Sequence, residues 1–382
     1  MTRRSARLIR AAAFGLLLAA GSLFATTPAA AVRSAQRTDR APSLPDRLTD
    51  AEFWTLVSDI SEPGGYFQIA DNYTSNELEI GRVFTMLRDA GVHSGAYLGV
   101  GPEQNFTYIA AIHPAMAFIV DIRRQAVMQH LMYKALFEVS KDRAEFISLL
   151  FSKPRPDGLD ESTAIQKIWS AFAPVATDPA AMSRNKALIV DRLTKAHGFT
   201  FTESESAELE SVIDAFAEYG PSISTRGAAG GRAAGNNATF EDLTGWSTDG
   251  TGEPRSFLAT EDDFRYVKGL HEKNLIVPVS GDFGGPKAIR AIGTYLKRQG
   301  GTVSAFYVSN VEQYLFQDRK ERAFYDNVAA LPVTDASVFI RPYSLRQYRS
   351  AEGSLCPIAG FLDAVAHGRV QTNYDSLSCV GR

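Results

Sequence analysis

The stretch Gly95–Ile109, GAYLGVGPEQNFTYI, decides the fold expected for this chain. A short apolar run ends in two glycines, Gly99 and Gly101, and polar residues follow before the chain becomes apolar again. This order is typical of a buried strand that turns sharply into a helix. The next apolar run, Met116–Ile122, lacks polar alternation, as strands buried on both faces of a parallel sheet do. The stretch therefore predicts the first strand-turn-helix-strand unit of an α/β protein.

A second unit of the same kind lies in the last third of the chain. Residues 274–285, NLIVPVSGDFGG, form another apolar run that ends in glycines, and residues 286–300 show the apolar period of an amphipathic helix. An apolar run at 302–310 follows, and Val338–Tyr343 is a further candidate strand. We therefore predict an α/β fold with a Rossmann-like, mostly parallel sheet flanked by helices.

Helical patterns fill much of the remaining chain. An apolar stripe predicts a helix near residue 50, and a second helix is expected to begin with Ser75 as its N-cap. About one hundred residues after the first unit are too many for a simple crossover, so we interpret them as a helical insertion. The predicted organisation is a single domain at 50–350, with the insertion at about 124–220 and a mobile Gly/Ala loop at about 225–239, and a C-terminal tail at 351–382.

The N-terminus predicts export. Four arginines precede the uncharged run Ala11–Ala25, and Ala29–Ala31 supply an A-x-A cleavage site. This is the pattern of a secretory signal peptide over residues 1–31, with an uncleaved anchor as the alternative. Residues 32–49 are mostly polar and predict a flexible leader. We therefore expect an exported protein, periplasmic or secreted, without stable membrane insertion after signal cleavage.

The amino-acid composition of the chain limits the classes of molecule that we expect it to bind. The chain is 45% hydrophobic and 22% charged, which is typical of a globular protein with a large core. Its formal charge is −3, and removal of the four N-terminal arginines lowers this charge to about −7. Nucleic-acid binding needs a basic footprint that this composition does not supply. The two cysteines, Cys356 and Cys379, predict a disulfide in an oxidising compartment, with two free thiols as the alternative.

Polar residues gather where the predicted strands end, and ligands of parallel sheets bind at that edge. A glycine turn lets the backbone approach a ligand, and an acid that ends the next strand accepts hydrogen bonds from a ribose. Asp121 follows Gly101 by about 20 residues, which is the expected spacing. Candidate cofactor-binding residues are Gly99, Gly101, Glu103, Asn105 and Asp121. Candidate substrate-binding residues are Asp282, Ser309, Asn310, Glu312 and Tyr314, and residues 72–77 are expected to fold over the same mouth.

The glycine turn and Asp121 resemble the cofactor site of class I S-adenosylmethionine-dependent methyltransferases. The chain is also similar to a family of uncharacterised bacterial proteins built on that fold. The segments that carry this similarity are NYTSNELEIGRVFTML, YLGVGPEQNFTYIAAIHPAMAFIVDIRRQ, NLIVPVSGDFGGPKAIRAIG and AFYVSNVEQYLF. The resemblance spans roughly residues 70–345. It implies a methyltransferase-like fold, and by fold alone S-adenosylmethionine as a cofactor, but it carries no established activity.

The chain departs from the methyltransferase pattern at two positions. Tyr97 stands where the glycine motif usually opens with an acid, and Gln104 or Asn105 replaces the third glycine. An exported chain also works where adenosylmethionine is not normally supplied. Our first hypothesis is therefore a polar crevice for a nucleoside-like small molecule, with methyl transfer as the favoured reaction if the protein is an enzyme.

Two other functions stay open at this point. One is a non-catalytic scaffold or interaction protein that has lost cofactor binding, whose protein partner the sequence does not identify. The other is a hydrolase or lyase that uses Glu103 and Asp282 as an acid/base pair. We expect no metal site, because the six histidines are scattered without metal-ligand spacing.

Overall fold

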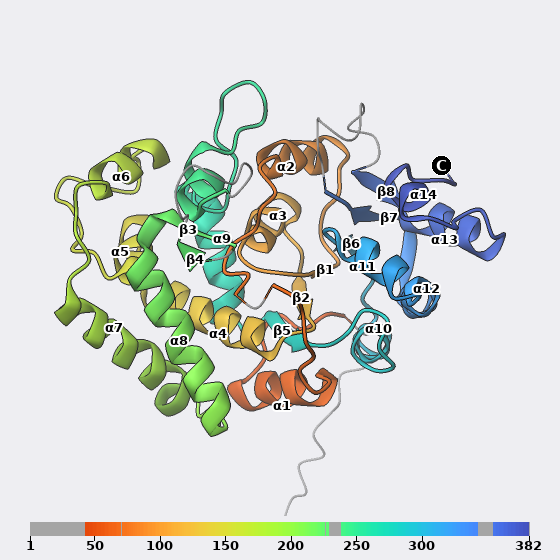
Figure 1. Cartoon of the computed structure of the whole chain (residues 1–382), viewed down its shortest axis with the longest axis horizontal. Coiled ribbons are helices and arrows are strands. Elements are labelled where there is room, and N and C mark those ends of the chain that lie inside the picture. Colours follow the sequence, from red (N-terminus) through yellow and green to blue (C-terminus); the bar gives the residue numbers. More distant parts are fainter. Residues whose placement is uncertain (1–42, 70, 226, 229–237, 343–353, 382) are drawn as a thin grey trace, which may run out of the picture. The chain divides into compact units, whose positions relative to one another are not determined.

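A six-stranded sheet forms the centre of the fold (Figure 1). The structure is a computed structural model that describes residues 43–69, 71–225, 227–228, 238–342 and 354–381. The strands lie in the order β5-β2-β1-β6-β7-β8, and each neighbouring pair is parallel except β7 and β8. Counted along the chain within this sheet, the order is 3-2-1-4-5-6, which is that of doubly wound Rossmann folds. The predicted Rossmann-like α/β fold is confirmed.

The sheet is buried on both faces at its centre. Its strands are β1 (Ala96–Gly99), β2 (Met116–Asp121), β5 (Ile276–Ser280), β6 (Val303–Tyr307), β7 (Val333–Ile340) and β8 (Leu355–Pro357). Every residue of β1, β2 and β5 is buried, as apolar runs without polar alternation require. Leu98 of β1 lies between Phe118 of β2 and Phe306 of β6 in the strand register. The functional edge is therefore set by where these buried strands end.

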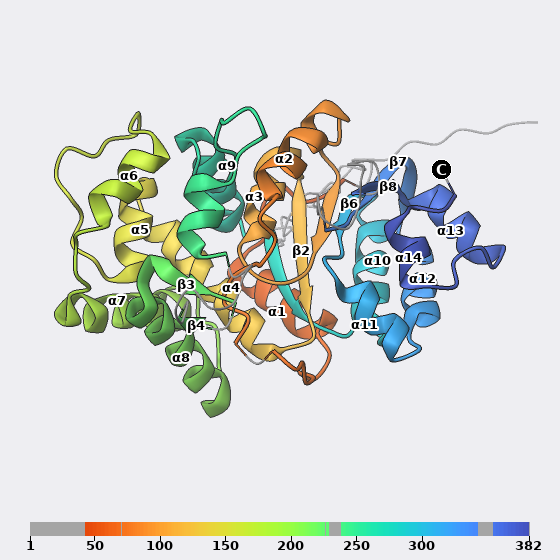
Figure 2. The same ribbon diagram turned by 45° about the horizontal axis from the view of Figure 1, so that its top comes forward.

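Helices cover the sheet on both sides (Figure 2). One group contains α2 (Ile80–Asp89), α3 (Gln104–Ile112), α4 (Arg124–Val139) and α9 (Glu261–Glu272). The other contains α10 (Ala288–Arg298), α11 (Val311–Gln317) and α12 (Glu321–Ala329), and α1 (Asp50–Ile60) packs on α10 and β5. All nine residues of α3 are buried, so the helix that follows the glycine turn lies inside the protein.

The chain after β2 is helical over the predicted insertion (Figure 1). Its elements after α4 are α5 (Arg143–Phe151), α6 (Ile165–Phe172), α7 (Pro179–Asp191), a π-helical turn (Arg192–Ala196) and α8 (Glu203–Tyr219). Helix α8 packs along α4. After a 3-10 turn (Gly220–Ser222), β3 (Ile223–Ser224) pairs with β4 (Gly227–Ala228), and a second π-helical turn follows at Asp242–Trp246. Most of the predicted mobile loop at about 225–239 lies outside the described residues.

The predicted start of α2 is wrong. The helix begins at Ile80, and Ser75 lies before it as a buried residue. The backbone N–H of Ser75 donates to the Glu103 carboxylate over 3.2 Å. This contact joins residues that are distant in sequence, so the local capping pattern could not predict it.

The predicted signal peptide and most of the predicted leader lie outside the described residues. Within the described residues, Leu48 is buried and its N–H donates to the Lys273 carbonyl. Thr49 then caps α1 in a reciprocal capping box with Glu52. Over the part of the chain that the structure describes, no helix combines the length and apolar character needed to cross a membrane.

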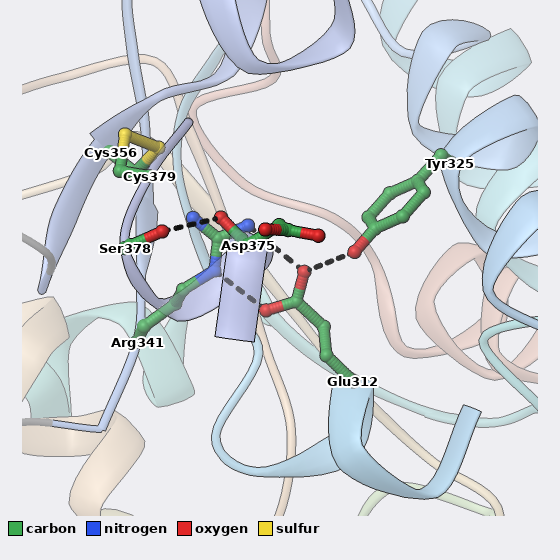
Figure 3. The surroundings of a disulfide bond; sticks show 7 residues. All are labelled: Glu312, Tyr325, Arg341, Cys356, Asp375, Ser378 and Cys379. Carbon is green, nitrogen blue, oxygen red and sulfur yellow. Dashed lines mark hydrogen bonds and ion pairs between the residues drawn. A yellow bond between two sulfur atoms is a disulfide. The ribbon is translucent and has the colours of Figure 1, made fainter. Parts of the chain in front are cut away.

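The predicted C-terminal tail contains β8, α13 (Ile358–Ala366) and α14 (Asn373–Leu377). Strand β8 extends the sheet beside β7, and α13 packs on β7. Cys356 of β8 and Cys379 form a disulfide between buried side chains, with their Cα atoms 5.7 Å apart (Figure 3). The disulfide therefore holds the end of the chain against the edge of the central sheet.

We predict that the disulfide stabilises this edge. Replacing both Cys356 and Cys379 by Ala removes a cross-link between residues 23 apart, which corresponds to about 3 kcal/mol of unfolding free energy. Urea unfolding with and without dithiothreitol measures the effect. Wild type should lose stability on reduction, whereas the double variant should be less stable and insensitive to the reductant. Equal midpoints for all samples would contradict this role.

Candidate functional site

A crevice of about 380 Å³ opens at the carboxyl ends of β1, β2, β5 and β6. Its walls come from the turns after β1, β2, β5 and β6, and residues 66–69 and 72–76 contribute a further wall. This position includes the boundary between β1 and β6, where chain connections leave the sheet in opposite directions. Ligands of doubly wound sheets bind at such a switch point. The predicted site residues that line the crevice are Gly101, Asp121, Asp282, Ser309, Asn310 and Tyr314.

The glycine turn after β1 has two glycines with different roles. Gly101 has φ +77°, a conformation that side-chain-bearing residues rarely adopt, and it lines the crevice. Gly99 does not line it: a Cβ there would lie 1.9 Å from Oδ1 of Asn105. Asn105 also lies outside the lining, because its side-chain amide donates to the carbonyls of Val100, Gly101 and Pro102. Gly99 and Asn105 therefore shape the turn, and Gly101 presents it to the crevice.

Gln104 occupies the third position of the glycine motif and lines the crevice. Its side chain is 2% exposed, and its Nε2 donates to the Val100 carbonyl and to the Tyr307 hydroxyl. Because a carbonyl can only accept, this contact fixes the orientation of the amide. The Tyr307 hydroxyl in turn donates to Glu77, whose pKa is raised by burial. Gln104 therefore links the β1 turn to the end of β6.

Asp121 ends β2 and lies in the crevice wall as a buried residue. Its carboxylate pairs with Arg123: Oδ1 accepts from the backbone N and Nε of Arg123, and Oδ2 accepts from Nη2 over 3.0 Å. Arg123 also donates to the Asp71 carbonyl. A carboxylate offers about four lone-pair positions. Three are used among the described residues, so Oδ2 keeps one position for a ligand donor.

The turns after β5 and β6 supply the opposite wall. Asp282 accepts from the backbone N–H of Gly284 and forms an ion pair with Lys320 over 2.7 Å. Ser309 donates to Glu77, and Asn310 is exposed in the crevice. Tyr314 lies edge to face with Phe67, at a centroid distance of 5.1 Å. This wall therefore combines a charged pair, an amide and aromatic rings.

Glu103 is buried outside the crevice lining. Its Oε1 accepts the Ser75 N–H, and its Oε2 has no hydrogen-bond partner among the described residues. Burial raises the pKa of its carboxyl to about 8, so the group is mainly protonated at neutral pH. His130 is also buried, with its Nε2 on the Gly101 carbonyl, and burial lowers its pKa to about 4. Both side chains therefore support the glycine turn in their neutral forms.

Glu312 is buried within the protein instead of facing the crevice. Its carboxylate accepts two bonds from Arg341, at 2.6 Å and 2.9 Å, and one from the Tyr325 hydroxyl at 2.8 Å (Figure 3). The Glu312 and Arg341 side chains are 2% and 0% exposed. Glu312 therefore fixes α11, which carries Tyr314 into the crevice wall.

Sequence analysis did not identify Tyr66, Phe67 and Gln68 as lining residues. The chain reaches the mouth because Glu62 N donates to the Ser280 carbonyl and Gly65 N donates to the Ile122 carbonyl. These contacts lie at the ends of β5 and β2, and no local sequence pattern predicts them. Asn72, Ser75 and Asn76, from the segment expected to cover the mouth, also line the crevice. Asp318 and Lys320 were likewise not selected, since they follow α11 instead of ending a strand.

Together the fold and the crevice define a Rossmann-like α/β protein with a cavity at its topological switch point. Residues 73–174 and 240–376 match the family described as Domain of unknown function (DUF7790), and the chain belongs to this family. None of the curated proteins matches the chain. The expected similarity to an uncharacterised family is therefore confirmed, whereas the family match carries no methyltransferase assignment.

The buried Glu312–Arg341 pair yields a stability prediction. Glu312→Ala leaves the Arg341 guanidinium buried without its carboxylate, and such changes cost about 3–5 kcal/mol. Asp363→Ala is the matched control, because it breaks an ion pair with Arg369 whose side chains are 59% and 47% exposed, and should cost less than about 1 kcal/mol. Chemical unfolding measures both. Similar losses in the two variants would contradict the assigned role of Glu312.

The buried Glu103 carboxyl yields a pH prediction. Its pKa rises from 4.5 to about 8 on folding, so between these values the folded state holds a proton that the unfolded state has released. Stability therefore falls as pH rises through this window. His130 acts in the opposite sense between about pH 4 and 6.5, so the window from 6.5 to 8 lies above its contribution.

We expect Glu103→Gln to flatten the stability profile between about pH 6.5 and 8, because the amide does not titrate there. Urea unfolding at several pH values measures the slope. Glu210→Gln, on the exposed face of α8, serves as the control and should keep the wild-type slope. An unchanged slope in Glu103→Gln would contradict a protonated Glu103 in the folded state.

Proposed function

We propose that this protein binds a nucleoside-like small molecule in the crevice at the switch point. The observation that carries the proposal is an open cavity of about 380 Å³ at the carboxyl ends of β1, β2, β5 and β6. Small-molecule sites occupy about 300–1,000 Å³, so this cavity suits a compact ligand. The side chains best placed to fill this cavity are those of Gln104 and Phe283. Both form part of its wall, so the cavity stays open.

Three features of the wall support a nucleoside-like ligand. Gly101 brings backbone to the surface, and a Cβ there would meet Gln104 Nε2 at 3.4 Å, so little protein covers the turn. Asp121 Oδ2 keeps one acceptor position at the end of β2, where a ribose hydroxyl is bound in related folds. Phe67 and Tyr314 provide half-buried aromatic surface for a base. The Asp121 carboxylate, the Gly101 turn and the two aromatic rings therefore border the same cavity.

S-adenosylmethionine is one test ligand of this class. The Gly101 turn and Asp121 fit its nucleoside part, whereas Gln104 stands where the third glycine of the motif is expected. When bound, that cofactor would supply an activated methyl group. The proposal itself is limited to binding and includes no methyl-transfer step.

The other two functions receive less support from the geometry. A scaffold that has lost its ligand would favour a filled crevice, but the cavity is open. An acid/base pair of Glu103 and Asp282 would need both carboxyls at the cavity, but Glu103 is buried outside its lining. Asp282 is also occupied by Lys320. A binding function therefore accounts best for these positions.

We also propose that the protein acts outside the cytoplasm, in the periplasm or the external medium. The Cys356–Cys379 disulfide supports this location, because disulfides persist mainly in oxidising compartments. Export also restricts the choice of ligand, since an exported protein would bind molecules that are present outside the cell. The predicted signal peptide is the sequence feature behind this proposal.

Calorimetric titration with adenosine, S-adenosylmethionine and S-adenosylhomocysteine tests the binding proposal. At least one should bind the wild type, and Asn310→Trp should weaken that binding about tenfold or more by filling the mouth. Lys297→Trp, on the exposed face of α10, should bind as the wild type does. Absence of binding to a folded wild-type protein, or equal weakening by both variants, would overturn the proposal.

A further inference from the structure

Two acceptors in the crevice wall keep room for a further hydrogen bond. Gln104 Oε1 is buried and has no hydrogen-bond partner among the described residues, although the Nε2 of the same amide is fully engaged. Asp121 Oδ2 likewise keeps one acceptor position. A buried acceptor without a donor costs about 1–3 kcal/mol. A ligand that donates hydrogen bonds would therefore be stabilised at both positions.

The charge of the crevice lining also favours one class of ligand. Among the described lining residues, Asp121, Asp282 and Asp318 carry carboxylates, and Lys320 carries an ammonium group. That ammonium already pairs with Asp282, and Arg123 behind the wall pairs with Asp121. Asp318 is exposed at the end of α11. The lining therefore has an excess of negative charge, which favours a cation.

One helix start at this edge of the sheet is already occupied by a carboxylate of the protein. At α10, Glu62 accepts from the backbone N–H groups of Lys287 and Ala288 over 2.8 Å and 2.9 Å. Helix N-termini bind phosphate through free N–H groups. A phosphate at the start of α10 would therefore have to displace the Glu62 carboxylate.

Aromatic rings complete the environment expected around an organic cation. Phe67 and Tyr314 meet at 88°, so their faces form a corner in the wall that also contains Asp318. A cation over an aromatic face gains about 0.5–1 kcal/mol at exposed sites and more where water is excluded. Carboxylates beside such rings select a positively charged group over a neutral one.

We propose that the crevice recognises an organic ammonium ion on a nucleoside-sized body and discriminates against phosphorylated ligands. The cation lies near Asp318 and the Phe67–Tyr314 corner, and donor groups of the ligand meet Gln104 Oε1. This inference rests on the proposed function for the location and size of the site. It adds the sign of the ligand charge, which the nucleoside proposal alone leaves open.

Three adenosine derivatives that differ in charge test the inference. The 5′-amino analogue of adenosine is cationic, adenosine is neutral, and adenosine monophosphate is anionic. By calorimetry, we expect the amino analogue to bind about tenfold tighter than adenosine, and the monophosphate to bind weakest. Added salt should weaken the amino analogue most, because its affinity depends on exposed charge. Equal or tighter binding of the monophosphate would overturn the inference while the nucleoside proposal would stand.

A second probe pair separates the two proposals. Benzyltrimethylammonium carries a cation on an aromatic body that is not a nucleoside, and phenylacetate is its anionic counterpart. Selective binding of the ammonium probe, without binding of any nucleoside, would remove the nucleoside proposal and retain the inference on charge. If neither the ammonium probe nor the amino analogue binds, the inference is overturned.

Two variants locate the cation. Asp318→Asn should weaken the ammonium probe about two- to fivefold, as expected for an exposed charge pair, and weaken adenosine less. Phe67→Leu should also weaken this probe, because it removes the aromatic face but keeps an apolar side chain. Asp326→Asn is the matched control, since Asp326 pairs with Arg322 on α12 outside the lining. Equal effects of Asp318→Asn and Asp326→Asn would contradict the assigned position.

Discussion

The crevice depends on how the backbone amides at the ends of parallel strands are satisfied. Where a strand turns into a helix, the first N–H groups of the helix lack partners within it. In this protein Glu62 supplies acceptors to the start of α10, and its backbone N–H pairs with the end of β5. The same residue therefore stabilises the turn and holds residues 61–69 across the sheet edge. That crossing creates the wall in which Phe67 lies, so an internal carboxylate determines the shape of the site.

The other side of the crevice rests on a buried carboxylate, that of Glu312. Glu312 connects α11 to Arg341 after β7 and to Tyr325 on α12. The Arg341 guanidinium also lies over the rings of Phe339 and Phe361, and the disulfide fixes the neighbouring chain end. A buried ion pair is costly unless its geometry is good and its remaining bonds are made. The hydrogen bonds from Arg341 and Tyr325 meet most of this requirement, so α11 keeps a fixed position from which Tyr314 reaches the crevice.

The sequence was sufficient to predict the sheet and its functional edge, because buried parallel strands require continuous apolar runs that end in turns. Gly101, Asp121 and Asp282 could be predicted as lining residues, since each follows directly from the end of a strand. Glu312 could not be assigned in the same way: it lies on a helix after the strand, where its direction depends on the distant Arg341. Residues 61–69 could not be placed because their position comes from long-range backbone contacts, such as that of Gly65 with Ile122.

Gln104 stands at the position of the third glycine in the motif of doubly wound folds, where a glycine allows close packing of the helix on the strand. Gln104 instead joins Val100 to Tyr307, and Tyr307 to Glu77, so hydrogen bonds cross from β1 to β6 and to the segment that covers the mouth. The amide group that makes these connections through nitrogen keeps its oxygen free of protein partners within the described residues. Gln104 thus stabilises the crevice by joining its two walls, and its oxygen adds a buried acceptor beside the turn.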